Sequence, residues 1–284
     1  MAKIQISCPS CAQIGMIEVL EETVKNVSRG LLAVNIASRT ICEHSFIVYV
    51  DKNLHVRDYF VADFQIEIPD LPISPADKIR DMQFPSKDVV DIDLIKLNMP
   101  AILLTYILKS IFSKQKIVLI SDQEFLYNHI TNFFNYITKN TFDIDIAILT
   151  PDNYNQNKKQ YKEYMIFEGN KIIKNMKKLI NPKKLWVEKH IVSRFLTEPE
   201  LGYSYIVLKN EIQKAYELSK SIVEAVQESR KDGEKENILK IIGEIEDYYK
   251  IKIGSLYLNF LIEIIQTYFD MAVPTVVESF FNSL

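Results

Sequence analysis

Three cysteines and one histidine near the start of the chain constrain its fold more than any other feature. Cys8 and Cys11 are separated by two residues, the spacing of a zinc knuckle whose tight turn directs two thiolates at one ion. Cys42 and His44 follow about thirty residues later, and a one-residue spacing on a strand would place both side chains on one face. We therefore predict a closed Cys3His site for a structural Zn2+ ion, in which four protein ligands leave no position for a catalytic water.

The alternative is that these are buried free cysteines beside a core histidine. An odd number of cysteines, all within the first forty-two residues, argues against a disulfide framework and favours a reducing compartment in which thiolates bind metal. The N-terminus lacks the basic and then apolar regions of a secretory signal, and no apolar stretch is long and uninterrupted enough to span a bilayer. We therefore expect a cytoplasmic protein without a transmembrane segment.

The residues after the second ligand pair predict a β-hairpin. The runs 46–50 and 54–60 are strand-like and flank the polar turn Asp51-Lys52-Asn53. His55 lies beyond this turn with no cysteine near it, so we expect an exposed strand residue there rather than a ligand.

The segments CPSC, SRGLLAVNI, ICEHSFIVYVDKN and VRDYFVADF together resemble the zinc-ribbon-like head of a set of uncharacterised archaeal proteins. The resemblance covers residues 1–68 and implies a small zinc-stabilised β module that is attached to different downstream domains.

The rest of the chain predicts an α/β domain followed by helices. Three prolines at positions 69, 72 and 75 indicate a linker over residues 69–91, because proline removes a backbone donor and biases its predecessor away from helix. An α/β domain over 92–208 and a helical region over 209–284 then follow. We expect a buried helix over 101–112, a strand over 116–120, a helix over 123–139, a strand over 142–149 and a hairpin over 163–173 that turns at 168–170. Helices over 210–230, 235–250 and 253–281 follow, the last of them broken before Pro274.

The α-β-α-β order favours a short, mainly parallel sheet with a right-handed crossover. Ligands of open α/β sheets gather beyond the carboxyl ends of the strands. The candidate ligand-binding residues are therefore Ser121, Asp122, Thr150 and Asp152. The competing interpretation is structural, because Ser121 and Glu124 have the spacing of a capping box at the start of the next helix.

The segment MPAILLTYILKSIFSKQKIVLISDQEFLYNHITNFFNYI is similar to the central part of DENN domains, in which an apolar helix leads to a lysine-preceded strand and then to another helix. The similarity spans residues 92–150. It implies a protein that engages small GTPases, either promoting nucleotide exchange or acting as a scaffold at membranes. This chain departs from such proteins in that their longin-like first lobe is either missing or replaced by the zinc module, so the resemblance assigns no functional residue.

Charge is distributed unevenly along the chain. The segment 156–190 contains ten lysines and three glutamates, a net charge of about +7, whereas the whole chain carries -3. A solvated lysine-rich surface is the simplest interpretation, and attachment to an anionic membrane is an alternative. The sequence pI of about 5.9 argues against a dedicated nucleic-acid binder.

These features favour a function other than catalysis. With only 7 glycines the chain contains no glycine-rich phosphate loop, and no nucleophile and base stand in a recognisable catalytic setting. The leading hypothesis is a non-catalytic regulatory or scaffolding protein that binds a protein partner such as a small GTPase. The first alternative is a ligand- or nucleotide-binding α/β protein, either a binding protein or an enzyme, that uses the loops after residues 120 and 149. The second is attachment to an anionic membrane or to nucleic acid through 156–190.

Overall fold

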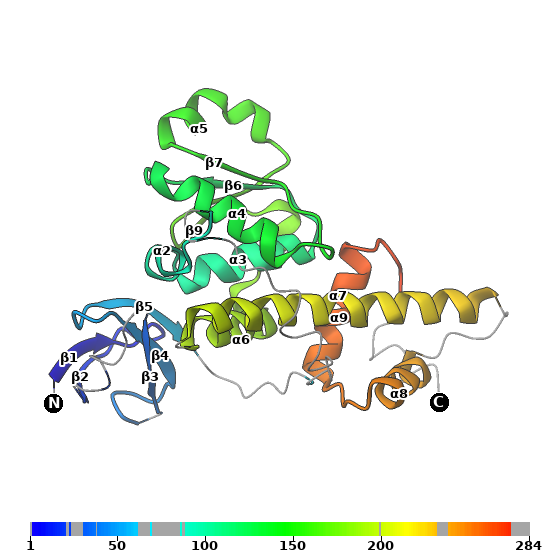
Figure 1. The fold of residues 1–284 in the computed structure, drawn as a ribbon, viewed down its shortest axis with the longest axis horizontal. Helices are drawn as coiled ribbons and strands as arrows, with labels where there is room; N and C mark the ends of the chain where they lie inside the picture. The colour runs from blue at the N-terminus through cyan, green and yellow to red at the C-terminus, as the bar shows by residue number, and fades with distance from the viewer. Residues whose placement is uncertain are drawn as a thin grey trace.

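The fold mixes helices with antiparallel and parallel sheets (Figure 1). The computed structural model describes residues 2–20, 23, 31–37, 39–61, 69, 86, 89–198, 200–231 and 238–273. The N-terminal part contains two small antiparallel sheets, the central part a sheet with parallel strands, and the C-terminal part helices. The expected order of these three parts is confirmed, while most of the linker predicted over 69–91 lies outside the described residues.

The N-terminal module consists of a two-stranded and a three-stranded antiparallel sheet. β1 (Ala2–Ser7) pairs with β2 (Ile14–Val19). β4 (Phe46–Val50) is the central strand between β3 (Leu32–Ile36) and β5 (Val56–Val61). The predicted hairpin of β4 and β5 is confirmed. Alternate residues of these strands, among them Ile4, Ile6, Ile17 and Val48, are buried together, because successive side chains of a strand point to opposite faces.

Asp51 organises the turn between β4 and β5. Its Oδ1 accepts hydrogen bonds from the backbone N–H of Asn53 at 2.8 Å and of His55 at 2.9 Å. Its Oδ2 accepts from Nε of Arg57 at 2.7 Å. Burial raises the pKa of this carboxyl, but the backbone hydrogen bonds and the Arg57 guanidinium outweigh burial and hold the pKa below its ordinary value. His55 itself is exposed and lies just before β5.

The central sheet has the strand order β7-β6-β8-β9. β6 (Ile117–Ile120) is buried along its whole length and pairs in parallel with β7 (Ile146–Leu149) and with β8 (Met165–Glu168). β9 (Lys171–Lys174) is an antiparallel edge strand. The predicted parallel pair and the predicted hairpin are therefore both present. We did not predict that the parallel pair and the hairpin belong to one sheet. Hairpin signals lie in neighbouring residues, whereas the pairing of β6 with β8 joins segments far apart in the sequence.

Helices cover this sheet and continue beyond it. α2 (Ile92–Asn98) and α3 (Ala101–Phe112) precede β6, α4 (Tyr127–Ile137) connects β6 to β7, and α5 (Pro151–Asn157) follows β7. Met99 has the extended backbone expected of a residue before proline, which ends α2 and lets α3 begin after Pro100. Within the described ranges no single helix is long and apolar enough to cross a membrane. α2 and α3 together have the required length and hydropathy, but their axes are bent by 108° where they join.

The C-terminal helices are α6 (Trp186–Thr197), α7 (Leu201–Lys231), α8 (Ile238–Tyr249) and α9 (Ser255–Thr267). α7 begins nine residues before the predicted start at 210 and runs through the expected boundary between residues 208 and 209. The helix predicted from 253 with a break before Pro274 does end before that proline, but earlier than the proline requires, because α9 ends at Thr267 and Asp270 adopts a positive φ of 52° that no α-helix contains. The part of that prediction beyond 273 lies outside the described residues.

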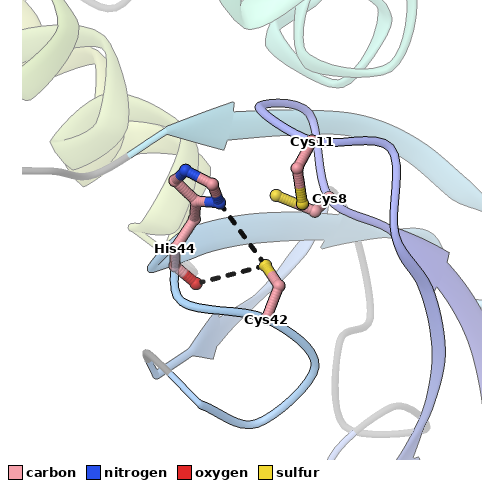
Figure 2. Close-up of side chains that lie close together, drawn as sticks. All are labelled: Cys8, Cys11, Cys42 and His44. Atoms are coloured by element: carbon pink, nitrogen blue, oxygen red, sulfur yellow. Dashed lines mark hydrogen bonds between the residues drawn. The ribbon is translucent and has the colours of Figure 1, made fainter.

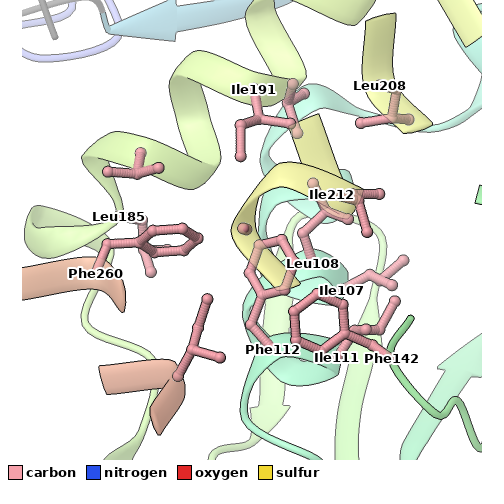
Figure 3. Close-up of a cluster of buried hydrophobic side chains, with 14 of the residues drawn as sticks. Ile107, Leu108, Ile111, Phe112, Phe142, Leu185, Ile191, Leu208, Ile212 and Phe260 are labelled. Carbon is pink, nitrogen blue, oxygen red and sulfur yellow. The ribbon is translucent and has the colours of Figure 1, made fainter. Parts of the chain in front are cut away.

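α3 is the centre of the core, as its apolar sequence predicts. It lies between the sheet and the C-terminal helices, and Phe112 makes edge-to-face contacts with Phe142 and Phe260 at centroid distances of 5.0 and 5.3 Å. Figure 3 shows side chains that meet here from α3, α6, α7 and α9, together with one from the loop before β7 and one from the residue before α6: Ile107, Leu108, Ile111, Phe112, Phe142, Leu185, Ile191, Leu208, Ile212 and Phe260.

The N-terminal module packs against this core. Leu31, Tyr49 and Phe60 belong to the same buried cluster as α3 and α6. Asp58 of β5 accepts a hydrogen bond from the backbone N–H of Ala101 at 2.5 Å. The module therefore supplies a carboxylate to the N-terminus of α3, where the first N–H groups have no partner within the helix.

Candidate metal centre

The first ligand pair lies in the turn between β1 and β2. The backbone N–H of Cys8 donates to the carbonyl of Gln13 at 2.8 Å, and that of Ala12 donates to the carbonyl of Cys8 at 2.8 Å. The N–H of Ser10 points at Sγ of Cys8 at 3.4 Å. Such a turn directs backbone donors and both sulfur atoms, those of Cys8 and Cys11, toward one point, as the two-residue spacing predicts.

The second pair lies in the loop between β3 and β4. The prediction that Cys42 and His44 share one face of a strand is wrong, because β3 ends at Ile36 and β4 begins at Phe46. The carbonyl of Cys42 accepts from the backbone N–H of Arg39 at 2.6 Å within the loop. This carbonyl therefore forms a hydrogen bond within the loop and not with a neighbouring strand. The loop, and not a strand, brings the side chains of Cys42 and His44 together.

The four side chains converge (Figure 2). One ligand atom from each of Cys8, Cys11, Cys42 and His44 lies within 4.8 Å of the others, and Sγ of Cys42 is 3.6 Å from Nδ1 of His44. Zn–S bonds of about 2.3 Å and Zn–N bonds of about 2.0–2.1 Å at a tetrahedral angle place sulfur and nitrogen about 3.6 Å apart. The Cys3His group is thus compact enough to hold one metal ion.

The protonation of the thiols reflects their crowding. Burial raises the pKa of Cys8, but the backbone N–H groups of Cys11 and Ser10 outweigh burial and lower this pKa to about 7. The backbone of His44 acts to lower the pKa of Cys42, whereas burial and the neighbouring sulfur atoms of Cys8 and Cys11 raise it to about 11. Three thiolates this close repel one another, so the arrangement favours a bound cation.

The cluster stands on the core of the N-terminal module. Cys8 is buried with Ile6 and Phe46, while Cys11 is exposed. Ile41, the residue before Cys42, packs over Gly15 of β2, where an added Cβ would lie 2.7–2.9 Å from three atoms of the Ile41 side chain. Gly15 is therefore required for the close approach of the second ligand loop to the first sheet.

The other predicted site lies at the carboxyl ends of β6 and β7. The backbone N–H of Ser121 donates to the carbonyl of Leu149 at 2.9 Å, so the two loops are adjacent as predicted. The predicted capping box of Ser121 and Glu124 is wrong, because Oγ of Ser121 accepts from the N–H of Gln123 at 3.1 Å and α4 begins only after a 3-10 turn. Thr150 is the side chain that caps a helix here, accepting from Asn153 at 3.2 Å at the start of α5.

A cavity of about 150 Å³ lies beside Ser121. Its walls are mainly apolar, from Leu103 of α3, Leu119 of β6 and Phe167 of β8. Of the four residues predicted to bind a ligand, all of which the structure describes, Ser121 lines this cavity, whereas Asp122, Thr150 and Asp152 lie outside the lining.

One group of charged side chains was not predicted from the sequence. Lys109 of α3 is buried and pairs with Glu188 of α6 and Glu263 of α9. The signal was a single lysine within the apolar run of residues 101–112, because a buried lysine requires an acidic partner. The sequence does not indicate which carboxylates provide it.

Comparisons with protein-family models, with curated proteins and with solved structures each found no match to this chain.

Proposed function

We propose that the protein is a non-catalytic regulatory or scaffolding protein in which Cys8, Cys11, Cys42 and His44 hold a structural zinc ion. The geometry of the Cys3His group carries this proposal. Soft thiolate ligands in a tetrahedral arrangement select zinc among the common divalent ions, and four protein ligands complete its coordination. The ion would join the β1–β2 turn to the β3–β4 loop and so stabilise the core of the N-terminal module, against which Cys8, Ile41 and Cys42 pack.

The proposed partner is a protein, in particular a small GTPase, bound by the α/β body and its helices. Support comes from the similarity of residues 92–150 to the central part of DENN domains. That similarity requires β6 and β7 to be neighbours in one sheet, and they pair in parallel from Ile117 with Ile146 to Ile120 with Leu149. The buried helix α3 before β6 and the helix α4 after it agree with the same pattern.

Metal analysis tests the zinc proposal. We expect purified, unchelated protein to contain one zinc ion per chain, and the Cys42→Ser variant to lose most of it. Exchange of His55 for alanine is the matched control, because His55 is exposed and lies outside the cluster. Protein without bound metal, or equal zinc loss in both variants, would contradict the assignment.

Binding assays with small GTPases from the same cell test the partner proposal. We expect the intact protein to capture a GTPase in one nucleotide state, GDP-bound, GTP-bound or nucleotide-free, more strongly than in the others. Release of a fluorescent GDP analogue then separates exchange activity from scaffolding. The absence of binding in all three states would contradict the proposal, and binding that collapses between about 50 and 200 mM salt would favour charge-driven attachment through 156–190 instead.

A second candidate function is ligand binding at the loops after β6 and β7, and the cavity beside Ser121 favours it. A volume of about 150 Å³ is small for a metabolite, since ligand sites usually measure about 300–1,000 Å³. Thermal-shift screening with nucleotides and small metabolites tests this function, with Ser121→Leu as the variant that should abolish any shift.

A further inference from the structure

A second cavity lies between α6 and α9, far along the chain from the metal ligands. Its volume is about 390 Å³, within the range of about 300–1,000 Å³ that is usual for small-molecule sites. Trp186 and Glu188 line it from α6, and Leu256, Phe260 and Glu263 line it from α9. The cavity therefore combines apolar walls with two acidic groups.

The acidic groups are tied to one buried lysine. Nζ of Lys109 lies 2.6 Å from Oε2 of Glu263 and 3.4 Å from Oε1 of Glu188. The side chains of Lys109 and Glu188 are only 5% and 3% exposed, whereas that of Glu263 is 44% exposed. Two ionised carboxylates that share one ammonium group carry a net negative charge, and the burial of Glu188 means that water screens the charge on its side of the group weakly.

The shifted pKa of the Glu188 carboxyl agrees with a site from which water is excluded. Burial raises the pKa of its carboxyl, although the charge of Lys109 acts in the opposite direction. Ionisable groups that line a cavity and are shifted by burial and by a specific charge partner are characteristic of binding sites. Lys109 supplies one positive charge for two carboxylates, so a ligand cation would balance the remaining negative charge of Glu188 and Glu263.

The remaining walls select the shape of that cation. Trp186 and Phe260 present aromatic surface, which attracts an ammonium group and also packs against an alkyl chain. Lys184 lines the same cavity and is itself exposed, which places a positive charge on the solvent side of the site. A second positive charge on a ligand would therefore meet repulsion as it emerges from the cavity.

We propose that the cavity between α6 and α9 binds the alkylammonium group of a monoamine. The ammonium group contacts Glu188 and Glu263, and the alkyl chain lies against Trp186, Leu256 and Phe260. Lys184 disfavours polyamines. The same chemistry is offered by a free amine and by a lysine side chain of a protein partner.

Trp186 is the single tryptophan of the chain, so its fluorescence reports directly on this cavity. We expect a saturable change in its emission when n-hexylamine is added to the intact protein at neutral pH. Hexanol and hexanoate have the same chain length without the positive charge, and we expect at least about tenfold weaker effects from both, since a hydrogen bond to a charged group contributes about 1.5–3 kcal/mol. A response equal for all three compounds, or no response to the amine, would overturn the proposal.

Variants locate the site. Glu263→Gln should weaken hexylamine binding at least about tenfold, since the amide can still accept from Lys109 but carries no charge. Glu244→Gln is the matched control, because Glu244 is an exposed acidic residue of α8 whose side chain is 64% exposed, and binding should be unchanged. Equal affinities of the Glu263→Gln variant and the intact protein would refute the assignment, and circular dichroism of each variant verifies its fold.

A charge reversal provides an independent measurement. Lys184→Glu changes an exposed residue and should raise the affinity for spermidine relative to hexylamine. An unchanged ratio would contradict the role given to Lys184. Titration with N-acetyl-lysine-N-methylamide distinguishes the two sources of the cation: tighter binding of this blocked lysine indicates a side chain of a partner, tighter binding of hexylamine indicates a free amine, and failure of both overturns the proposal.

Discussion

Exchange of Gly15 for alanine tests how the second ligand loop is positioned. Replacing a strand glycine by alanine normally stabilises the folded protein by about 0.4–1 kcal/mol, because alanine reduces the conformational freedom of the unfolded chain. At Gly15 the new Cβ would lie 2.7, 2.8 and 2.9 Å from three carbon atoms of Ile41. Non-bonded carbon atoms prefer separations of about 3.5–4.0 Å, so Ile41 must move by about 0.8 Å or more.

This movement determines the expected magnitude. Overpacking of this kind costs about 1–3 kcal/mol, and once the stabilisation of about 0.4–1 kcal/mol through the unfolded state is subtracted, the net loss is about 1 kcal/mol at mid-range and at most about 2.6 kcal/mol. Because Ile41 precedes Cys42, the displaced loop should also weaken zinc binding, by about tenfold or more if it behaves like other groups that support metal ligands. Gly15→Ala should therefore reduce stability and zinc affinity together.

Urea denaturation followed by circular dichroism measures the first quantity, and competition with a coloured zinc chelator measures the second. Gly243→Ala is the matched control, since an added Cβ at Gly243 has no atom within 4 Å. Gly243 lies inside α8, where alanine is more favourable than glycine by about 0.8–1.0 kcal/mol, so this variant should be more stable and bind zinc normally. A Gly15→Ala protein at least as stable as the parent, with unchanged zinc affinity, would refute the packing argument.

Three further outcomes are expected. Asp58→Ala should cost about 0.5–2 kcal/mol in urea denaturation because the N-terminus of α3 loses its acceptor, whereas Asp58→Asn should stay close to the parent; equal losses would exclude capping. Asp51 contributes stability that is fully present above the ordinary aspartate pKa of about 3.9 and is lost as the pH falls through its lowered folded-state pKa. Asp51→Asn should therefore reduce the free energy of unfolding at pH 7 and make that free energy fall less steeply as the pH is lowered. Parallel pH profiles of the variant and the parent would contradict this. Phe112→Ala should cost about 3–5 kcal/mol by thermal or urea unfolding, and Phe125→Ala, at a site 61% exposed, almost nothing.

Several features were predictable because neighbouring residues encode them. The spacing of Cys8 and Cys11 predicts a tight turn, the apolar run 101–112 predicts a buried helix, and the strand-like runs on either side of Asp51 predict a hairpin. The convergence of the four ligands was also foreseen, although for a partly wrong reason. Cys42 and His44 meet through a loop, and the local hydrogen bond from Arg39 to Cys42 could not be inferred from a one-residue spacing.

Other features depend on residues far apart in the sequence. The capping box at Ser121 has the right spacing but is not formed, because the chain continues from β6 into a 3-10 turn before α4. The pairing of β8 with β6 requires the crossover from β7 to pass over β6, which no local pattern specifies.

The sequence by itself determined which side chains can bind a metal and which segments become helices and strands, because ligand chemistry and backbone preference are properties of short stretches. Only the tertiary structure decided that Asp58 caps α3, that Gly15 lies under Ile41, and that Glu188 and Glu263 share Lys109. The physical reason is that these contacts form when separate elements pack together, and packing depends on the shape of the whole core rather than on any one segment.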